Sequence, residues 1–118
     1  MDSNRVRVNE LAEHVWLVEL MGEHDLSTAA QVEAAIDQVF RSGSKLVLDL
    51  SGATFVDSSV LAAILRAQGR ADLDEDDELA VVAPPGSPAR RLLDLVVVGD
   101  RVQICESRAD AIDAPHAG

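Results

Sequence analysis

The segment KLVLDLSGATFVDSSVLAAIL (residues 45–65) sets the expected fold of the chain. Its first six residues, KLVLDL, are mostly apolar, which is typical of a central strand covered on at least one face. Its last residues repeat apolar side chains at helical spacing, so an interior strand is expected to lead directly into an amphipathic helix. The positions expected in the core are Leu46, Leu48 and Leu50 of this strand, Leu61, Ile64 and Leu65 of this helix, and Val32, Ile36 and Val39 of an earlier helix.

Polar and turn-forming residues divide the rest of the chain into further elements. Strands are predicted at 5–8, 14–20, 79–83 and 101–105, and helices at 28–43, from Pro88 onward with Ser87 as its cap, and for about one turn after Ser107. Thr28, with Gln31 three residues later, is typical of a capping box, and Gly43 is a typical helix stop. The segments 22–27 and 72–78 are expected to be a turn and an acidic surface loop or frayed helix end.

The order of these elements is β-β-α-β-α-β-α-β, which favours an α/β fold. We expect a mixed, mostly parallel sheet of about five strands, with three to four helices packed on it and right-handed crossovers. The first strand is expected to be antiparallel. The chain has 118 residues, which fits one domain. That domain is expected to span 1–118, with its core at 4–112 and a loose tail at 113–118.

The charge of the chain narrows the range of partners. It carries 21 Asp and Glu against 10 Lys and Arg, a formal net charge of −11. Nucleic acids and anionic membranes would be repelled, so neither is an expected partner. A protein with a basic patch would instead be attracted.

The sequence has the features of a cytoplasmic protein. It contains one cysteine, Cys105, so no disulfide can form within the chain, and this residue is expected to be a core residue of its strand. The first ten residues, MDSNRVRVNE, lack the apolar core of a signal peptide. The uninterrupted apolar runs, such as VLAAIL, are far shorter than the roughly 20 residues that a membrane helix needs.

The Asp57-Ser58-Ser59 sequence allows two interpretations. Asp57 suits a helix N-cap, because its carboxylate can accept hydrogen bonds from the free amides of the first turn. Ser58 would then be the first helical residue, with its hydroxyl free near the surface. In the simpler interpretation the sequence is only a good helix start. In the functional one a serine is phosphorylated, which a helix N-terminus tolerates because its amides and dipole favour negative charge.

Three segments in order give the chain a specific resemblance. MGEHDLSTA (21–29), LVLDLSGATFVDSS (46–59) and SPARRLLDL (87–95) are together similar to the anti-sigma factor antagonists with a STAS domain. The resemblance covers nearly the whole chain. It implies a STAS fold and a protein that is not an enzyme, needs no cofactor of its own, and acts as the substrate of a kinase.

The resemblance also implies partners and site residues. In that family an anti-sigma factor, which is also a serine kinase, phosphorylates the serine directly after the aspartate, here Ser58; Ser59 is the rival acceptor. The unphosphorylated antagonist binds the anti-sigma factor and frees a sigma factor, and a phosphatase can reset it. The partner surface implied by the resemblance consists of Gly22, Glu23, His24, Asp25, Asp57, Ser58, Ser59 and Val60.

Other hypotheses remain open beside this one. The family usually has glycine where this chain has Val60, and a branched side chain there could hinder entry into a kinase cleft. This difference favours a second hypothesis, a constitutive STAS adaptor in a transporter or signalling assembly. Glu23, His24 and Asp25 could in principle suggest a metal site, but neighbouring residues seldom converge on one ion without further ligands. A serine hydrolase has no support, because no G-x-S-x-G motif surrounds Ser58.

Overall fold

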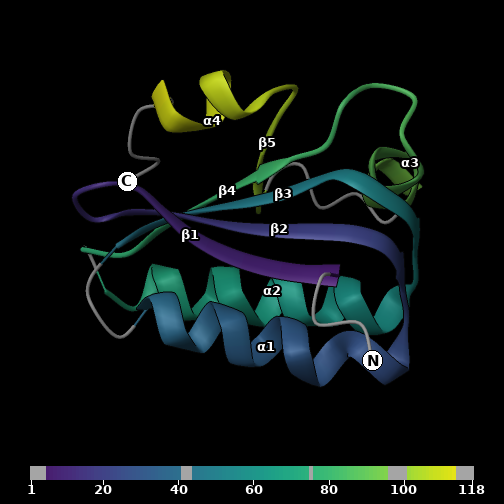
Figure 1. Ribbon diagram of the computed structural model, residues 1–118, viewed down its shortest axis with the longest axis horizontal. Coiled ribbons are helices and arrows are strands. Elements are labelled where there is room, and N and C mark those ends of the chain that lie inside the picture. The colour runs from purple at the N-terminus through teal and green to yellow at the C-terminus, as the bar shows by residue number, and fades with distance from the viewer. Residues whose placement is uncertain (1–4, 41–43, 75, 96–100, 114–118) are drawn as a thin grey trace.

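The computed structural model describes residues 5–40, 44–74, 76–95 and 101–113 (Figure 1). These residues form a five-stranded sheet and four helices. The strands are β1 (Val6–Ala12), β2 (Val15–His24), β3 (Lys45–Val56), β4 (Glu78–Val82) and β5 (Gln103–Cys105). The helices are α1 (Leu26–Phe40), α2 (Ser58–Asp72), α3 (Pro88–Leu95) and α4 (Arg108–Asp113).

The sheet has the strand order β1-β2-β3-β4-β5. β1 and β2 form an antiparallel hairpin, whose turn places His14 in a left-handed conformation with φ of 62°. Every other neighbouring pair in the sheet is parallel. The predicted α/β fold, with an antiparallel first strand and an interior β3, is therefore confirmed.

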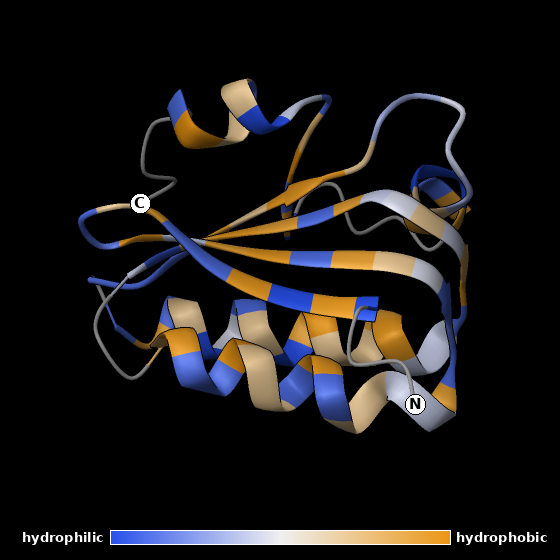
Figure 2. Ribbon diagram, in the orientation of Figure 1, coloured by the Kyte–Doolittle hydropathy of each residue, from blue (hydrophilic) through white to orange (hydrophobic). Residues whose placement is uncertain are grey.

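The helices cover the two faces of the sheet unequally. In Figure 1, α1 and α2 lie side by side against one face, and α3 and α4 lie on the other side. Figure 2 shows why α1 and α2 pack there, because hydrophobic and hydrophilic residues alternate along both helices while the strands are largely hydrophobic. One stripe of each helix can therefore be buried while the other stays in water.

The main core lies between the sheet and helices α1 and α2, and Ala89 and Leu93 of α3 also belong to it. Leu46, Leu48 and Leu50 of β3 are fully buried, as the apolar run predicts. The helix positions predicted for the core are also buried, except that Leu65 is half-buried and packs against the core from its margin. A smaller apolar cluster on the opposite face contains Leu17, Val47, Ala80, Val82 and Ala111, with Cys105 packed against it. Burial raises the pKa of the Cys105 thiol.

Helix α4 is tied to this second face by charge. Arg108 donates from Nε to Asp49 Oδ2 and from Nη2 to Glu19 Oε2, both at 2.5 Å. The side chain of Asp49 is only 3% exposed, although it is charged and lies in the central strand. Its Oδ1 also accepts from the amide and hydroxyl of Ser51, at 2.8 and 2.6 Å. Four N–H and O–H groups thus bond the buried carboxylate of Asp49 and the partly exposed carboxylate of Glu19.

Several predicted boundaries are wrong. α1 begins at Leu26 and not at Thr28, because Asp25 caps it and Thr28 is buried within the first turn. The predicted turn at 22–27 is wrong in its first half, since β2 continues to His24. The acidic segment 72–78 is not all surface loop, because Asp77 is only 5% exposed.

Two further predictions lie outside the described residues. These are the helix stop at Gly43 and the predicted tail at 113–118 beyond its first residue, Asp113, which is the last residue of α4. Within the described ranges, no helix combines the length and the apolar character that crossing a bilayer requires.

Candidate functional site

Two helices begin next to each other at one edge of the sheet. β2 leads into α1 through Asp25, and β3 leads into α2 through Asp57. β2 and β3 are parallel neighbours, with His24 paired to Val56 at their ends. The amide of Asp57 donates to the carbonyl of His24 at 3.2 Å. This hydrogen bond fixes the two helix starts side by side.

Asp57 caps α2 in the predicted way. Its Oδ1 accepts from the amide of Ser59 at 2.9 Å and from the hydroxyl of Ser59 at 2.5 Å. The hydrogen bond from the Ser59 hydroxyl is the largest reason that the pKa of Asp57 lies below its ordinary value, and it outweighs the opposing effect of desolvation. The hydroxyl of Ser59 is therefore engaged in the cap.

Ser58 is in the opposite situation. It is the first residue of α2 and is exposed. Its hydroxyl forms no hydrogen bond with any of the described residues. The side chain thus adds nothing to the cap and stands in solvent at the start of the helix.

Asp25 caps α1 with the same geometry. Its Oδ1 accepts from the amide and the hydroxyl of Ser27, at 2.9 and 2.5 Å. Thr28 completes a capping box, because its Oγ1 accepts from the amide of Asp25 at 3.2 Å. The hydrogen bonds from Ser27 lower the pKa of Asp25. Asp25 and Asp57 are thus two ionised caps at one edge of the sheet.

Two residues of the expected partner surface have buried side chains. His24 and Val60 are both 0% exposed, so their side chains do not reach the surface of this chain. His24 Nε2 lies 3.0 Å from the carbonyl of Met21, to which it donates, and Nδ1 lies 3.0 Å from Thr28 Oγ1. Both ring nitrogens are occupied, and the described residues contain no group of three potential metal ligands.

Val60 lies in the main core among the residues that α2 packs against the sheet. It is the third residue of α2 and points inward, whereas Ser58, two residues earlier, is exposed. A branched side chain at this position therefore does not project over the Ser58 hydroxyl.

The remaining expected residues lie at the surface. Gly22 has a left-handed φ of 80°, which a side chain would strain, and it precedes an irregularity in the β2–β3 pairing between Gly22 and Glu23. Glu23 is exposed beyond this irregularity. Arg5 donates from Nη1 to the carbonyl of Glu23 at 3.3 Å.

Sequence reasoning missed two apolar residues at this edge. Leu26, the first residue of α1, is 76% exposed, and Phe55, paired with Glu23, is 50% exposed. The residues next to Leu26 and Phe55 in the sequence could have indicated that both are exposed. Leu26 lies between two polar residues of a helix start, and Phe55 precedes Val56, which takes the inward position.

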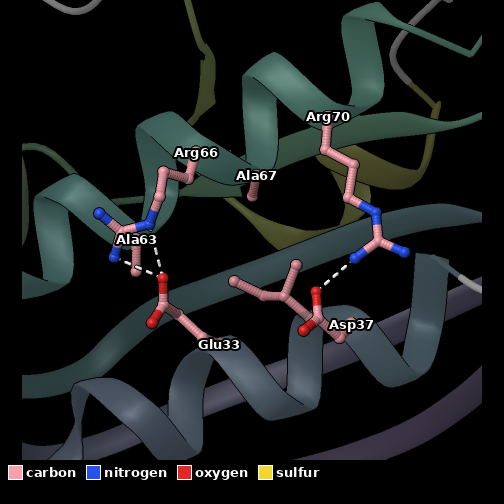
Figure 3. A pocket seen from close by; sticks show the side chains of 7 residues that line it. Glu33, Asp37, Ala63, Arg66, Ala67 and Arg70 are labelled. Atoms are coloured by element: carbon pink, nitrogen blue, oxygen red, sulfur yellow. Dashed lines mark hydrogen bonds and ion pairs between the residues drawn. The ribbon is translucent and has the colours of Figure 1, made fainter.

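A groove of about 250 Å³ between α1 and α2 is the other candidate site (Figure 3). Ile36, Ala63 and Ala67 contribute apolar side chains to its lining. Its charged side chains pair across the groove: Arg66 Nε donates to Glu33 at 2.6 Å, and Arg70 bonds Asp37 and lies over the ring of Phe40. The four charged residues that line the groove are therefore paired with one another across it.

Comparison with known proteins gives the family. Residues 9–102 match the family model described as "Mlab, STAS domain". The chain is 28% identical to an anti-sigma factor antagonist from Mycobacterium paratuberculosis, with 92% of this chain and 91% of that one covered and a TM-score of 0.83. It is 19% identical to unphosphorylated SpoIIAA, also an anti-sigma factor antagonist, with 92% and 94% covered and a TM-score of 0.71.

The phosphorylated form of SpoIIAA, described as a Bacillus cell fate determinant, is similar as well. It is 18% identical, with 92% of this chain and 96% of that one covered and a TM-score of 0.67. The two SpoIIAA structures share the fold of this chain. Because the family model covers most of the chain, the chain belongs to the STAS domain family.

Proposed function

We propose that this protein is an anti-sigma factor antagonist that is switched at Ser58. Unphosphorylated, it binds an anti-sigma factor and so frees a sigma factor; phosphorylated on Ser58 by that same partner, it lets the partner go. The observation that carries this proposal is the exposed hydroxyl of Ser58 at the start of α2, next to a serine whose hydroxyl is already engaged. Membership of the STAS family and the 28% identity to an antagonist support it.

The geometry supports a switch that leaves the fold unchanged. The free amides at the start of α2 favour an anion, so a phosphate on Ser58 does not oppose the helix. Asp57 keeps its own cap, because its carboxylate bonds Ser59 and not Ser58. The modification adds about −1.5 to −2 charges to a surface that already holds Asp25 and Asp57. A partner bound there would be expelled by the bulk of the phosphate and by the cost of removing its water.

The role proposed is that of a binding protein in the cytoplasm. ATP and magnesium belong to the kinase partner, and a separate phosphatase resets the switch. The chain itself needs no cofactor for either step. Its −11 charge suits a partner with a basic surface and not a nucleic acid.

The alternative is a STAS adaptor that is never phosphorylated. The feature that favoured it was Val60, which was expected to obstruct a kinase. Because Val60 is wholly buried, this obstruction has no support in the arrangement of side chains. The experiment below separates the two functions.

The test is phosphorylation by a recombinant anti-sigma factor kinase from the same organism. The wild-type chain, Ser58→Ala and Ser59→Ala are incubated with the kinase, ATP and magnesium, and are followed by intact mass and phosphopeptide mapping. We expect one phosphate on the wild-type chain and on Ser59→Ala, and none on Ser58→Ala. Ser58→Ala should stay bound to the kinase in the presence of ATP, whereas Ser58→Asp should bind it more weakly.

Two outcomes would count against the proposal. Phosphate on Ser59 would move the switch by one residue. Stable binding of the wild-type chain to the kinase with no phosphate on either serine would favour the constitutive adaptor.

A further inference from the structure

Leu26 holds the same position at the start of α1 that Ser58 holds at the start of α2. Each directly follows a capping aspartate and precedes a serine whose amide and hydroxyl bond that aspartate. Each is the first residue of its helix, and each is exposed. The side chain at this position takes no part in the cap, so a large apolar residue there is not required for the helix to begin.

Phe55 lies at the same edge of the sheet. It is paired with Glu23 in the parallel β2–β3 register, directly before the ends of the two strands. From Phe55 the chain passes through Val56 and Asp57 to Ser58, and from Glu23 it passes through His24 and Asp25 to Leu26. The hydrogen bond between the Asp57 amide and the His24 carbonyl holds these two segments together. Leu26 and Phe55 therefore flank the start of α2. Leu26 lies on the neighbouring segment, which begins α1, and Phe55 lies on the segment that leads into α2 itself.

The charged groups around these apolar residues are mostly acidic. Glu23 is exposed, and Asp25 and Asp57 are ionised at the two caps, close enough for the charge of Asp25 to act on Asp57. Arg5 also lies near these acidic residues. It bonds the carbonyl of Glu23, and its positive charge acts on the carboxylate of Asp25. We call Glu23, Asp25, Leu26, Phe55, Asp57 and Ser58 the Ser58 face.

We propose that Leu26 and Phe55 are the apolar anchors by which the Ser58 face binds its protein partner. This inference rests on the proposed function and identifies what the anti-sigma factor must offer. That partner presents an apolar depression, which takes up the two anchors, and a basic rim opposite Glu23, Asp25 and Asp57. A few well-packed residues near the centre of an interface, with aromatic side chains enriched among them, commonly carry most of its binding energy, and the rim around them is polar.

This arrangement explains why a phosphate on Ser58 ends binding. The anchors can bind only if the surface between and around them loses its water. A phosphate at Ser58 is strongly hydrated and must be desolvated together with the anchors, which is costly for an unpaired charge. The modification therefore weakens binding through the part of the interface where water is excluded, and not through the rim, where the partner is basic.

The test compares the partner affinity of three variants, each of which replaces one exposed apolar residue with serine. Affinity for the recombinant anti-sigma factor kinase, without ATP, is measured for the wild-type chain, Leu26→Ser, Phe55→Ser and the matched control Leu73→Ser. Leu73 is 89% exposed but follows the last residue of the 15-residue helix α2, about 22 Å from Ser58. We expect at least about a tenfold rise in Kd for Leu26→Ser and for Phe55→Ser, and no change for Leu73→Ser. Circular dichroism of each variant verifies that it is folded.

A charge variant tests the rim separately. Glu23→Gln should slow association at low salt and reduce its salt dependence, while leaving dissociation nearly unchanged, because rim charges mainly steer encounter. Glu10→Gln, on the exposed part of β1, is the matched control and should change neither rate.

The outcomes distinguish this inference from the function on which it rests. If folded Leu26→Ser and Phe55→Ser bind as tightly as the wild-type chain while Ser58→Asp still weakens binding, the anchors are refuted and the switch stands. If the wild-type chain does not bind the kinase at all, both proposals are refuted.

Discussion

Replacement of Arg108 by methionine should destabilise the fold more than loss of any exposed ion pair. The substitution keeps a long apolar stem but removes the groups that bond Asp49 and Glu19. Asp49 is nearly fully buried, so it would keep its charge with one hydrogen-bonding partner fewer. Removing one partner of a fully buried pair costs about 3–5 kcal/mol, and of an exposed pair about 0–1 kcal/mol.

The structure places Arg108 between these limits. Its side chain is 44% exposed, which screens the pair, and Asp49 would retain both hydrogen bonds from Ser51. A hydrogen bond to a charged group contributes about 1.5–3 kcal/mol, so we expect a loss of about 2 kcal/mol in the free energy of unfolding. For a chain of this size such a loss lowers the melting temperature by roughly 8 °C.

The assay is urea unfolding followed by circular dichroism, with Arg66→Met as the matched control. Arg66 pairs with Glu33, but their side chains are 60% and 40% exposed, so this control should lose less than about 1 kcal/mol. A loss for Arg108→Met no greater than for Arg66→Met would refute the reasoning. It would mean that the buried carboxylate gains nothing from its arginine.

The pH dependence gives a second check on the same pair. Burial raises the pKa of Asp49, but the hydrogen bonds from Ser51 and Arg108 outweigh it, and the net pKa lies below the ordinary 3.8. An aspartate with a lowered pKa stabilises the fold above its unfolded pKa, and this stabilisation is lost as the pH falls through the folded value. The difference between wild type and Arg108→Met should therefore be full at neutral pH and shrink below about pH 3.8. A difference that stays constant down to the acid transition would contradict this account.

Four further substitutions test the cap of α2, the buried acid and the core. Asp57→Ala should lower the urea midpoint, whereas Ser58→Ala should leave it unchanged, because only the aspartate caps α2; equal effects would be inconsistent with this cap. Burial and the charge of Asp74 raise the pKa of Asp77, whose buried Oδ1 has no partner among the described residues. Asp77→Asn should therefore be more stable than wild type at pH 7, and the gain should vanish as the pH falls through the raised pKa toward 3.8, where wild-type Asp77 also becomes neutral. Val60→Ala should cost about 1–3 kcal/mol, as for other core truncations, yet Ser58 should be phosphorylated as in wild type; unchanged stability on urea unfolding would argue against a core position.

The order of the strands and helices could be predicted because the spacing of apolar residues differs between strands and helices. Leu46, Leu48 and Leu50 alternate within a short run, and such a run is buried only in an interior strand. The start of α1 could not be predicted with the same certainty, because Asp25 and Thr28 are both good capping residues. The structure uses both, one as the cap and the other as the residue that accepts from the cap's amide. Only the three-dimensional arrangement shows which of the two residues is the N-cap of α1.

The candidate site was predicted where it depends on a local motif and was missed where it depends on packing. Asp57 and Ser59 form the cap that their spacing indicates, which leaves Ser58 exposed. The inward orientation of His24 was missed although it continues the alternation of Val18 and Leu20 along β2. β3 carries an extra residue at each of two irregularities in its pairing with β2, and no period in the sequence reports them. The exposure of Phe55 depends on the same part of the sheet.

The two twin helix starts separate stability from signalling. In each of them the aspartate accepts from the amide and the hydroxyl of the serine two residues later, and the residue between them takes no part in the cap. That middle position can therefore change its chemistry without cost to the fold, as serine and leucine do here. A regulatory site can be gained, lost or exchanged for a contact residue there by a single substitution, so the partners and the control of such a domain can diverge while its architecture stays the same.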